Sequence, residues 1–221
     1  MKPSEAAISG SEALPVRVVA LVMAAGCSRR FGAADKRLAR LGEGGTLLAA
    51  AVERAAAAFD DCYVVLREDD NPGALGLSSD TGLIRAPHAD QGLGSSLADA
   101  TAVLLDEMPG FETVAVLLGD MPDIAPATLA TLSRAASRDT ILCPVYRGRR
   151  GHPVLFGRAL WVELAALRGD RGAREVVRRH ASCLRLIHVE DPGIHRDVDT
   201  PDDIDWPQGL VPRRVSLSEG E

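Results

Sequence analysis

Apolar runs alternate along the chain with segments whose apolar positions recur at helical spacing. Residues 16–24 (VRVVALVMA) form a β-branched apolar run, and residues 62–67 (CYVVLR) are again typical of a strand. Between them, residues 46–59 begin with Thr and are rich in helix formers. This order predicts a strand, a helix and a second strand at the start of the chain.

The alternation continues through the middle of the chain. Strands are expected near 82–86 and at 113–119, and helices near 95–107 and from 126 to about 137. Because these strands are apolar on both faces and alternate with helices, we expect an α/β fold with a mostly parallel sheet flanked by helices. In such folds ligands bind beyond the carboxyl ends of the strands.

The pattern changes in the last third of the chain. Residues 140–146 (TILCPVY) and 152–157 (HPVLFG) flank RGRRG, which predicts a small antiparallel hairpin laid on the sheet. The remaining elements are expected in this order: a helix at about 158–167, a short helix at 173–180, a strand at 183–189 and an acidic segment. Residues 1–13 and 207–221 are rich in Ser, Glu, Gly and Pro without periodicity, so we expect disordered tails around one domain at 14–206.

Composition and charge narrow the classes of protein. The formal net charge of -6 argues against nucleic acid as the main partner, so any anion site must be local. The four cysteines are widely spaced, with no C-x-x-C pair or tight Cys/His cluster, which favours a reducing cytoplasmic location over a zinc site. The longest apolar run, residues 18–25, is far shorter than the roughly 20 residues of a membrane span. We therefore expect neither a nucleic-acid nor a membrane partner.

The first candidate site is the basic loop after the first strand, in the stretch LVMAAGCSRRFGAADKR. It lacks the dinucleotide fingerprint because the next glycine after Gly26 is Gly32, and it lacks a Walker A loop because Lys36 is followed by Arg37. Glycines nevertheless let backbone N–H groups approach phosphate oxygens, and Arg30 and Lys36 can add charged donors. The pattern fits either a phosphate-binding loop or a solvated basic loop.

Carboxylates provide the second and third candidate sites. In VLLGDMPDI an apolar strand ends at Gly119 and Asp120, which is how an α/β protein presents a ligand to Mg²⁺, although Asp120 could instead cap a turn. In HRDVDTPDDI, Asp197 and Asp199 at the end of the last strand could reach the same cation. The alternative is a plain helix start with Thr200 as the N-cap.

A glycine turn before a helix is the fourth candidate. In DQGLGSSLADA, Gly92, Gly94, Ser95 and Ser96 open the expected helix. Helix N–H groups there could bind an anion or a base edge, whereas a simple Ser N-cap explains the pattern almost as well.

Six motifs in one order resemble the MobA-like nucleotidyltransferases, and within them the molybdenum cofactor cytidylyltransferases. The matches lie between about residues 21 and 203. In the first half, MAAGCSRRFGAADK matches the family's L-A-A-G-x-S-x-R-M-G plus Lys, GLGSSL matches G-M-G-x-S-L, and LGDMP matches L-G-D-M-P. In the second half, RGRRGHPVLF matches G-x-x-G-H-P-V-L-F, LRGDRGAR matches L-x-G-D-x-G-A-R, and DVDTPDD matches D-x-D-T-P-E-D. There are two departures. Phe31 replaces the usual methionine, and three residues instead of two separate Gly32 from Lys36.

The resemblance implies a Rossmann-like nucleotidyltransferase fold, an NTP over the first loop, and Mg²⁺ on the aspartates. The catalytic residues it implies are Arg30, Lys36 and Asp120; the nucleotide- or substrate-binding residues are Ala24, Ala25, Gly26, Ser28, Gly92, Ser95, Gly119 and His152; and the metal ligands are Asp120 with Asp197 or Asp199. A terminal phosphate of the acceptor would attack the α-phosphorus of the NTP and expel pyrophosphate. Such a nucleophile is already ionised near neutral pH, so positioning and charge neutralisation would suffice.

The base and the acceptor are inferred from the same resemblance. The AAG at 24–26, where guanylyl enzymes usually have AGG, and the Gly151-His152-Pro153 turn resemble the cytidylyl branch, so CTP is expected rather than GTP. The acceptor would be molybdopterin or its molybdenum form, with His152 either contacting it or shaping the hairpin, and a molybdenum hydroxylase could receive the product. The alternatives are GTP or another phosphorylated acceptor, and a non-catalytic chaperone for a molybdenum enzyme.

Overall fold

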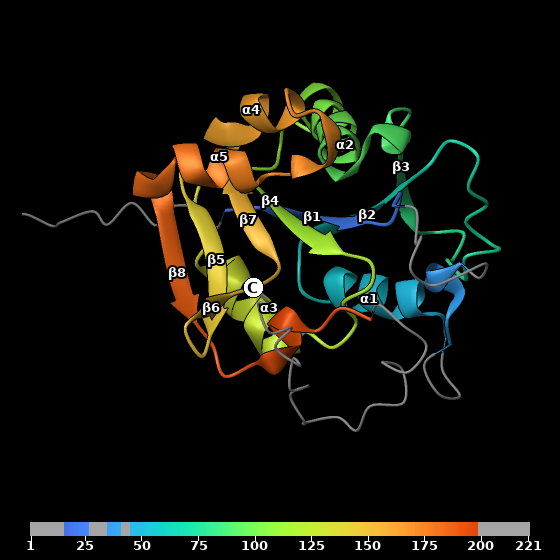
Figure 1. The fold of residues 1–221 in the computed structure, drawn as a ribbon, viewed down its shortest axis with the longest axis horizontal. Coiled ribbons are helices and arrows are strands. Elements are labelled where there is room, and N and C mark those ends of the chain that lie inside the picture. Colours follow the sequence, from blue (N-terminus) through green and yellow to red (C-terminus); the bar gives the residue numbers. More distant parts are fainter. Residues whose placement is uncertain (1–15, 27–34, 41–44, 199–221) are drawn as a thin grey trace, which may run out of the picture.

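The computed structural model describes residues 16–26, 35–40 and 45–198. Within these residues, strands form one eight-stranded sheet, and helices lie on both of its faces (Figure 1). The α/β fold expected from the sequence is therefore confirmed. The tails expected at 1–13 and 207–221 lie outside the described residues.

The sheet is mostly parallel, and its order is β3-β2-β1-β4-β7-β5-β6, with β8 also paired to β5. The strands are β1 (Val18–Met23), β2 (Asp61–Leu66), β3 (Gly82–Arg85), β4 (Thr113–Leu118), β5 (Ile141–Tyr146), β6 (Arg149–Arg150), β7 (Val154–Gly157) and β8 (Leu184–His188). Pairings β1–β2, β1–β4, β2–β3 and β5–β8 are parallel, while β6 and β7 run antiparallel to their neighbours.

Helices connect the strands much as the periodicity predicts. The α-helices are α1 (Leu47–Ala56), α2 (Leu93–Glu107), α3 (Pro126–Arg134), α4 (Trp161–Ala165) and α5 (Arg174–Arg179). Short 3-10 turns are η2 (Lys36–Leu38), η3 (Ala89–Gln91), η4 (Arg158–Leu160), η5 (Gly169–Arg171), η6 (Ala181–Cys183) and η7 (Pro192–His195). Helix α1 begins after Thr46 because the Thr46 hydroxyl accepts a hydrogen bond from the Ala49 N–H at 3.1 Å.

The position of the hairpin differs from the sequence prediction. Strand β7 lies within the sheet, between β4 and β5, and not against its face. Its neighbours Leu155 and Phe156 are both fully buried, and they belong to the cores on opposite faces of the sheet. Strand β7 therefore occupies an interior position, with backbone partners along both edges and buried side chains on both faces.

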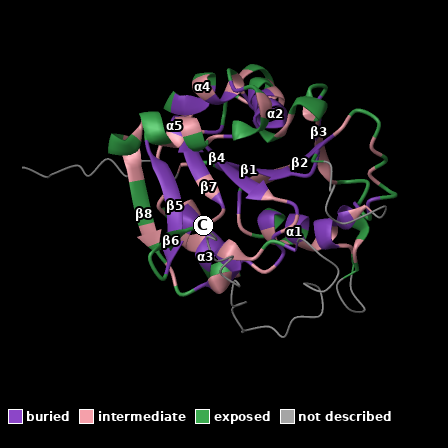
Figure 2. Ribbon diagram, viewed as in Figure 1, coloured by how far each residue is buried: buried purple, intermediate pink, exposed green. Residues whose placement is uncertain are grey.

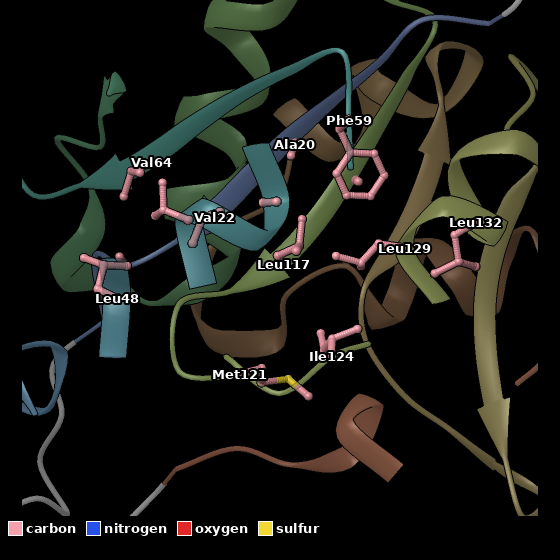
Figure 3. Packing of buried hydrophobic residues seen from close by; sticks show 14 of the residues in the cluster. Ala20, Val22, Leu48, Phe59, Val64, Leu117, Met121, Ile124, Leu129 and Leu132 are labelled. Carbon is pink, nitrogen blue, oxygen red and sulfur yellow. The ribbon is translucent and has the colours of Figure 1, made fainter. Parts of the chain in front are cut away.

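Two hydrophobic cores pack against the two faces of the sheet. Along β1, Val18, Ala20 and Val22 belong to the core with α1 and α3 (Figure 3), and the intervening residues belong to the core with α2 and α4. Side chains alternate between faces in a strand, so β1 is buried throughout (Figure 2). In the second core the buried Trp161 indole donates to the Phe156 carbonyl at 3.0 Å.

The carboxyl ends of the parallel strands meet at one edge of the sheet. Met23 pairs with Val65 of β2 and with Leu118 of β4, so the residues that follow these strands are neighbours. The Gly119 N–H donates to the Met23 carbonyl at 3.0 Å, which holds the end of β4 beside the end of β1. This edge therefore carries the candidate site.

Along the part of the chain that the structure describes, no helix combines the length and apolar character that crossing a bilayer requires.

Candidate active site

Lys36 and Asp120 form an ion pair at this edge. The Lys36 Nζ atom lies 2.8 Å from Asp120 Oδ2, and the lysine is almost fully buried, with 7% of its surface exposed. Turn η2 brings the lysine there, and Asp35 begins the turn by accepting a hydrogen bond from the Arg37 N–H. The extra residue between Gly32 and Lys36 thus does not prevent the lysine from reaching the end of β4.

Asp120 has one carboxylate oxygen that is buried and unpaired. Among the described residues, Oδ1 has no hydrogen-bond partner, while Oδ2 accepts from Lys36. Buried polar atoms are nearly always satisfied, so such an oxygen indicates a missing partner. Carboxylate oxygens are the ligands that hard divalent cations prefer, and Asp120 therefore fits a metal such as Mg²⁺. The described residues contain no group of three or more His, Cys, Asp or Glu side chains that could hold a metal.

Asp197 lies beside Asp120, but not at the end of the last strand as predicted. Strand β8 ends at His188, and the turn η7 follows before Asp197. Asp191 causes this detour, since its carboxylate accepts hydrogen bonds from the N–H groups of Gly193 and Ala125, both at 2.8 Å.

The chain after η7 returns to the edge of the sheet that carries the site. The Val198 N–H donates to the Asp120 carbonyl at 3.0 Å, which brings the backbone next to Asp197 to the end of β4. Asp199 and Thr200 lie outside the described residues, as do Ser28 and Arg30, so their roles stay predictions.

His152 stands close to both aspartates. Burial lowers its pKa, while the backbone of Val116 and the charges of Asp120 and Asp197 act in the opposite direction. The His152 Nδ1 atom is buried and, among the described residues, has no hydrogen-bond partner. An imidazole nitrogen without a partner can donate to or accept from a substrate, depending on which ring nitrogen carries the proton.

The glycine at the end of β4 allows close packing under the site. A Cβ atom at Gly119 would lie 2.9 Å from Leu48 Cδ1 and 3.2 Å from the Met23 carbonyl oxygen. A larger residue would therefore displace β1 or α1, and with them the start of the loop at 24–26. Position 119, beside the site, therefore has room for glycine but not for a side chain.

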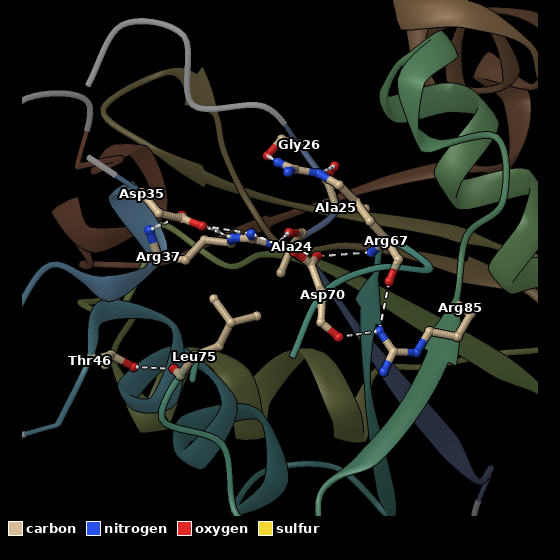
Figure 4. A network of polar contacts seen from close by, with 10 residues as sticks. All are labelled: Ala24, Ala25, Gly26, Asp35, Arg37, Thr46, Arg67, Asp70, Leu75 and Arg85. Atoms are coloured by element: carbon tan, nitrogen blue, oxygen red, sulfur yellow. Dashed lines mark hydrogen bonds and ion pairs between the residues drawn. The ribbon is translucent and has the colours of Figure 1, made fainter. Parts of the chain in front are cut away.

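Two arginines hold the carbonyls of the loop at 24–26 (Figure 4). Arg37 Nη1 donates to the Ala24 carbonyl at 2.9 Å, and Arg67 donates to the Ala25 carbonyl at 3.0 Å and to the Gly26 carbonyl at 2.6 Å. This arrangement was not predicted from the sequence, in which Arg37 only rules out a Walker A loop.

Asp70 joins these two arginines. Its carboxylate accepts from Arg37 Nη1 at 2.6 Å and Nη2 at 2.7 Å, and also from the Arg67 N–H at 3.0 Å. Asp70 is separated from Arg37 by 33 residues, so no local pattern indicates the pair. We call Arg37, Asp70 and Arg67 the arginine lock.

The N-terminus of α2 is occupied by the chain itself. The Ser95 hydroxyl is buried and accepts from the Gly169 N–H at 2.9 Å, so Ser95 is not the N-cap that the alternative interpretation supposed. Gly92 holds that position with φ of 115°, and the Asp170 carboxylate accepts from the Leu93 N–H at 3.4 Å. The motif LRGDRGAR thus packs on this terminus, and ligand binding by Gly92 and Ser95 stays a prediction.

Comparison with known proteins shows that this fold is that of a nucleotidyltransferase. The sequence matches the MobA-like NTP transferase domain over residues 20–183, which is most of the chain. The chain belongs to the MobA-like NTP transferase family. No curated protein matches it.

Solved structures of mycobacterial proteins share the fold. Rv0371c from Mycobacterium tuberculosis H37Rv is 29% identical, with a TM-score of 0.73 over 85% of this chain and 95% of that chain. Its homolog from Mycobacterium sp. strain JC1 is 33% identical, with a TM-score of 0.72 over 85% of this chain and 92% of that chain. Rv0371c has also been solved in complex with manganese, and that structure is 27% identical with a TM-score of 0.69 over 85% of this chain and 95% of that chain. These matches confirm the Rossmann-like nucleotidyltransferase fold.

Proposed function

We propose that this nucleotidyltransferase transfers CMP from CTP to the terminal phosphate of molybdopterin or its molybdenum form and releases pyrophosphate. The observation that carries the proposal is the Lys36–Asp120 pair with the unpaired Asp120 Oδ1, at the edge where the strands end. This arrangement supports transfer over simple binding, because it combines a buried cationic donor with an available metal ligand.

Asp120 would hold Mg²⁺ through Oδ1, and Asp197 or Asp199 would be the second ligand. When bound, a divalent cation supplies neutralisation of the negative charge that develops on the phosphates. The manganese complex of Rv0371c supports a divalent cation in this family. The position of the Asp197 backbone next to Asp120 supports Asp197 as a ligand.

Lys36 would donate to the departing pyrophosphate. Its ammonium group has three N–H donors, one of which bonds Asp120, and it lies at the edge of the sheet where the phosphates would bind. The carboxylate thus aims the lysine at the position where the phosphates would lie. Arg30 would add a second cationic donor, and Ser28 a hydroxyl group.

The nucleotide would lie on the backbone of the loop at 24–26, beside the glycine at position 119, with Gly92 and Ser95 near it. His152 would contact the acceptor through its Nδ1 atom, which is buried and has no partner among the described residues. The dinucleotide product would pass to a molybdenum hydroxylase, and the reaction would take place in the cytoplasm.

The test is a turnover assay with purified protein, Mg²⁺, molybdopterin and each of the four NTPs in separate reactions. Pyrophosphate release and the dinucleotide product are measured. Turnover with CTP alone is the expected result, and turnover with GTP would assign the protein to the guanylyl branch. Binding of nucleotide without pyrophosphate release from any NTP, tested with molybdopterin and with other phosphorylated acceptors, would favour a non-catalytic binding protein.

A further inference from the structure

The arginine lock leaves the loop at 24–26 with an unusual set of backbone groups. All three carbonyls accept hydrogen bonds from Arg37 or Arg67, and the Ala24 N–H donates to the Val65 carbonyl at 3.0 Å. The N–H groups of Ala25 and Gly26 have no partner within the described part of the chain. Among the described residues the loop thus offers two N–H donors, while each of its carbonyls already accepts one hydrogen bond from an arginine.

The lock is held in place because Arg37 is buried, Arg67 and Asp70 are half-buried, and each member makes more than one hydrogen bond. Arg37 is 8% exposed, and Asp35 on its other side accepts from Nε at 3.0 Å and from Nη2 at 2.7 Å. Arg85 adds a third cation, whose Nη1 donates to the carbonyls of Arg67 and Asp70 at 2.7 and 2.9 Å. Bidentate pairs of this kind fix geometry as well as charge.

The described residues do not crowd Gly26. Apart from Gly26 and its chain neighbours, none of their atoms lies within 4 Å of the position that a Cβ at Gly26 would take. The loop also follows β1 directly, at the edge of the sheet where ligands of parallel α/β folds bind. A ligand could thus reach the unpaired N–H groups from this side.

We propose that Asp70 is a positioning residue for nucleotide binding, which acts by holding Arg37 and Arg67 against the loop so that the N–H groups of Ala25 and Gly26 receive the nucleotide. The inference rests on the proposed function, which places the nucleotide on this loop. The same turn η2 carries Lys36, so the anchored Arg37 also holds the lysine at Asp120.

The lock also affects the choice of base. On its Watson–Crick edge cytosine presents two adjacent acceptors, O2 and N3, which match two N–H donors. Guanine presents one acceptor, O6, beside two donors, N1–H and the amino group, which would have to share carbonyls already bonded to the arginines. Loosening the lock should therefore weaken CTP binding more than GTP binding. A purely structural role for Asp70 would change the affinities for both nucleotides alike.

The experiment measures the dissociation constants of all four NTPs by calorimetry in the presence of Mn²⁺, for wild type, Asp70→Asn and Asp69→Asn. Asp69 is an exposed neighbour with the same chemistry and no hydrogen bond or ion pair within the described residues, so Asp69→Asn is the matched control. We expect the dissociation constant for CTP to rise about tenfold in Asp70→Asn, as for the loss of one charge-assisted hydrogen bond, and that for GTP to rise less than about threefold. The control should match wild type.

Arg67→Gln is the second variant, for the case in which Asp70→Asn does not fold. It removes the side-chain contacts to the carbonyls of Ala25 and Gly26 and leaves the Arg37 pairs intact. The same weakening of CTP relative to GTP is expected from it. Equal CTP affinity in wild type and in the folded variants would overturn the positioning role.

The outcomes separate this inference from the proposed function. A wild type that prefers another NTP would overturn the choice of CTP, and the effect of the variants on that NTP would then decide the role of Asp70. Binding of none of the four NTPs to wild type would overturn both proposals. Parallel loss of all nucleotides in Asp70→Asn would overturn the selective role.

Discussion

Lys36 Nζ lies 2.8 Å from Asp120 Oδ2, although 84 residues separate the two in the sequence. The pair couples the turn after the first loop to the end of β4, and it leaves Asp120 Oδ1 without a partner among the described residues. One oxygen of this carboxylate therefore accepts from a cationic donor, while the other is left for the proposed metal. Either residue can be removed separately, which makes their roles testable.

Asp120→Ala should abolish metal-dependent turnover while the fold remains. Asp120 is a partly exposed residue whose carboxylate contacts Lys36, so its loss leaves the hydrophobic cores intact. We expect a fall in kcat of at least about 10³-fold, the size expected when transition-state charge is no longer neutralised. Pyrophosphate release at saturating Mg²⁺ and thermal unfolding measure the two effects. A rate near that of wild type would exclude Asp120 as the metal ligand.

Lys36→Ala should lower kcat more than it weakens nucleotide binding. The lysine would contact the departing pyrophosphate most strongly in the transition state, so about 10²- to 10³-fold in kcat is expected with a small change in the dissociation constant for CTP. Arg40→Ala, four residues away on an exposed position, is the control for lost positive charge. Equal losses in binding and in kcat would instead point to a role in ground-state binding.

Acid should weaken the fold through Asp70. Burial raises the pKa of Asp70, but hydrogen bonds from Arg37 and Arg67 outweigh this effect and lower the pKa below its ordinary value. A carboxyl whose pKa is lower in the folded state than in the unfolded state stabilises the fold above the unfolded value of about 3.9. That stabilisation is lost as the pH falls through the folded pKa.

Urea unfolding of Asp70→Asn and wild type at pH 7 and at pH 3 checks this effect. At pH 7 we expect the variant to be less stable by about 3 kcal/mol, since it leaves a buried arginine with one carboxylate partner fewer. The difference should shrink as the pH falls below about 4, because wild-type Asp70 then becomes protonated. A difference independent of pH would mean that the Asp70 charge does not stabilise the lock.

Gly92→Ala should destabilise the start of α2. Gly92 has φ of 115°, and a Cβ atom there would overlap the Asp170 carboxylate. We expect a loss of about 1–3 kcal/mol in the free energy of unfolding, from strain and the displaced turn η5. Gly45→Ala is the control, because its Cβ would meet only Ala49 Cβ at 3.6 Å. Similar stability of the two variants would contradict the packing of Asp170 on this terminus.

The sequence predicted the elements that obey local periodicity. Strands such as β1 and β4 are continuous apolar runs, and the turn after Gly119 follows directly from the strand that ends there. The local pattern could not place β7 inside the sheet, because its pairing partners in β4 are about forty residues away in the sequence. It also placed Asp197 at a strand end, although Asp191 and η7 lie in between.

The candidate site was predictable only where a motif marks it. Asp120 stands in a short motif at a strand end, and Lys36 closes a basic loop. Arg37, Arg67 and Asp70 belong to no such pattern, because each contact joins segments that only the folded sheet brings together. Buried charge is costly unless it is paired, so the lock is a property of the tertiary structure rather than of the local sequence.

The interior position of β7 affects how the chain is made. A ribosome delivers β1 to β4 first, and the edge of β4 that β7 later pairs with remains open until Gly157 has been synthesised. A nascent chain that stops before that point presents an apolar strand with unpaired backbone groups, which is a template for aggregation. Expression fragments that end between β4 and β7 should therefore aggregate. A truncated form of this protein must retain the hairpin to stay folded.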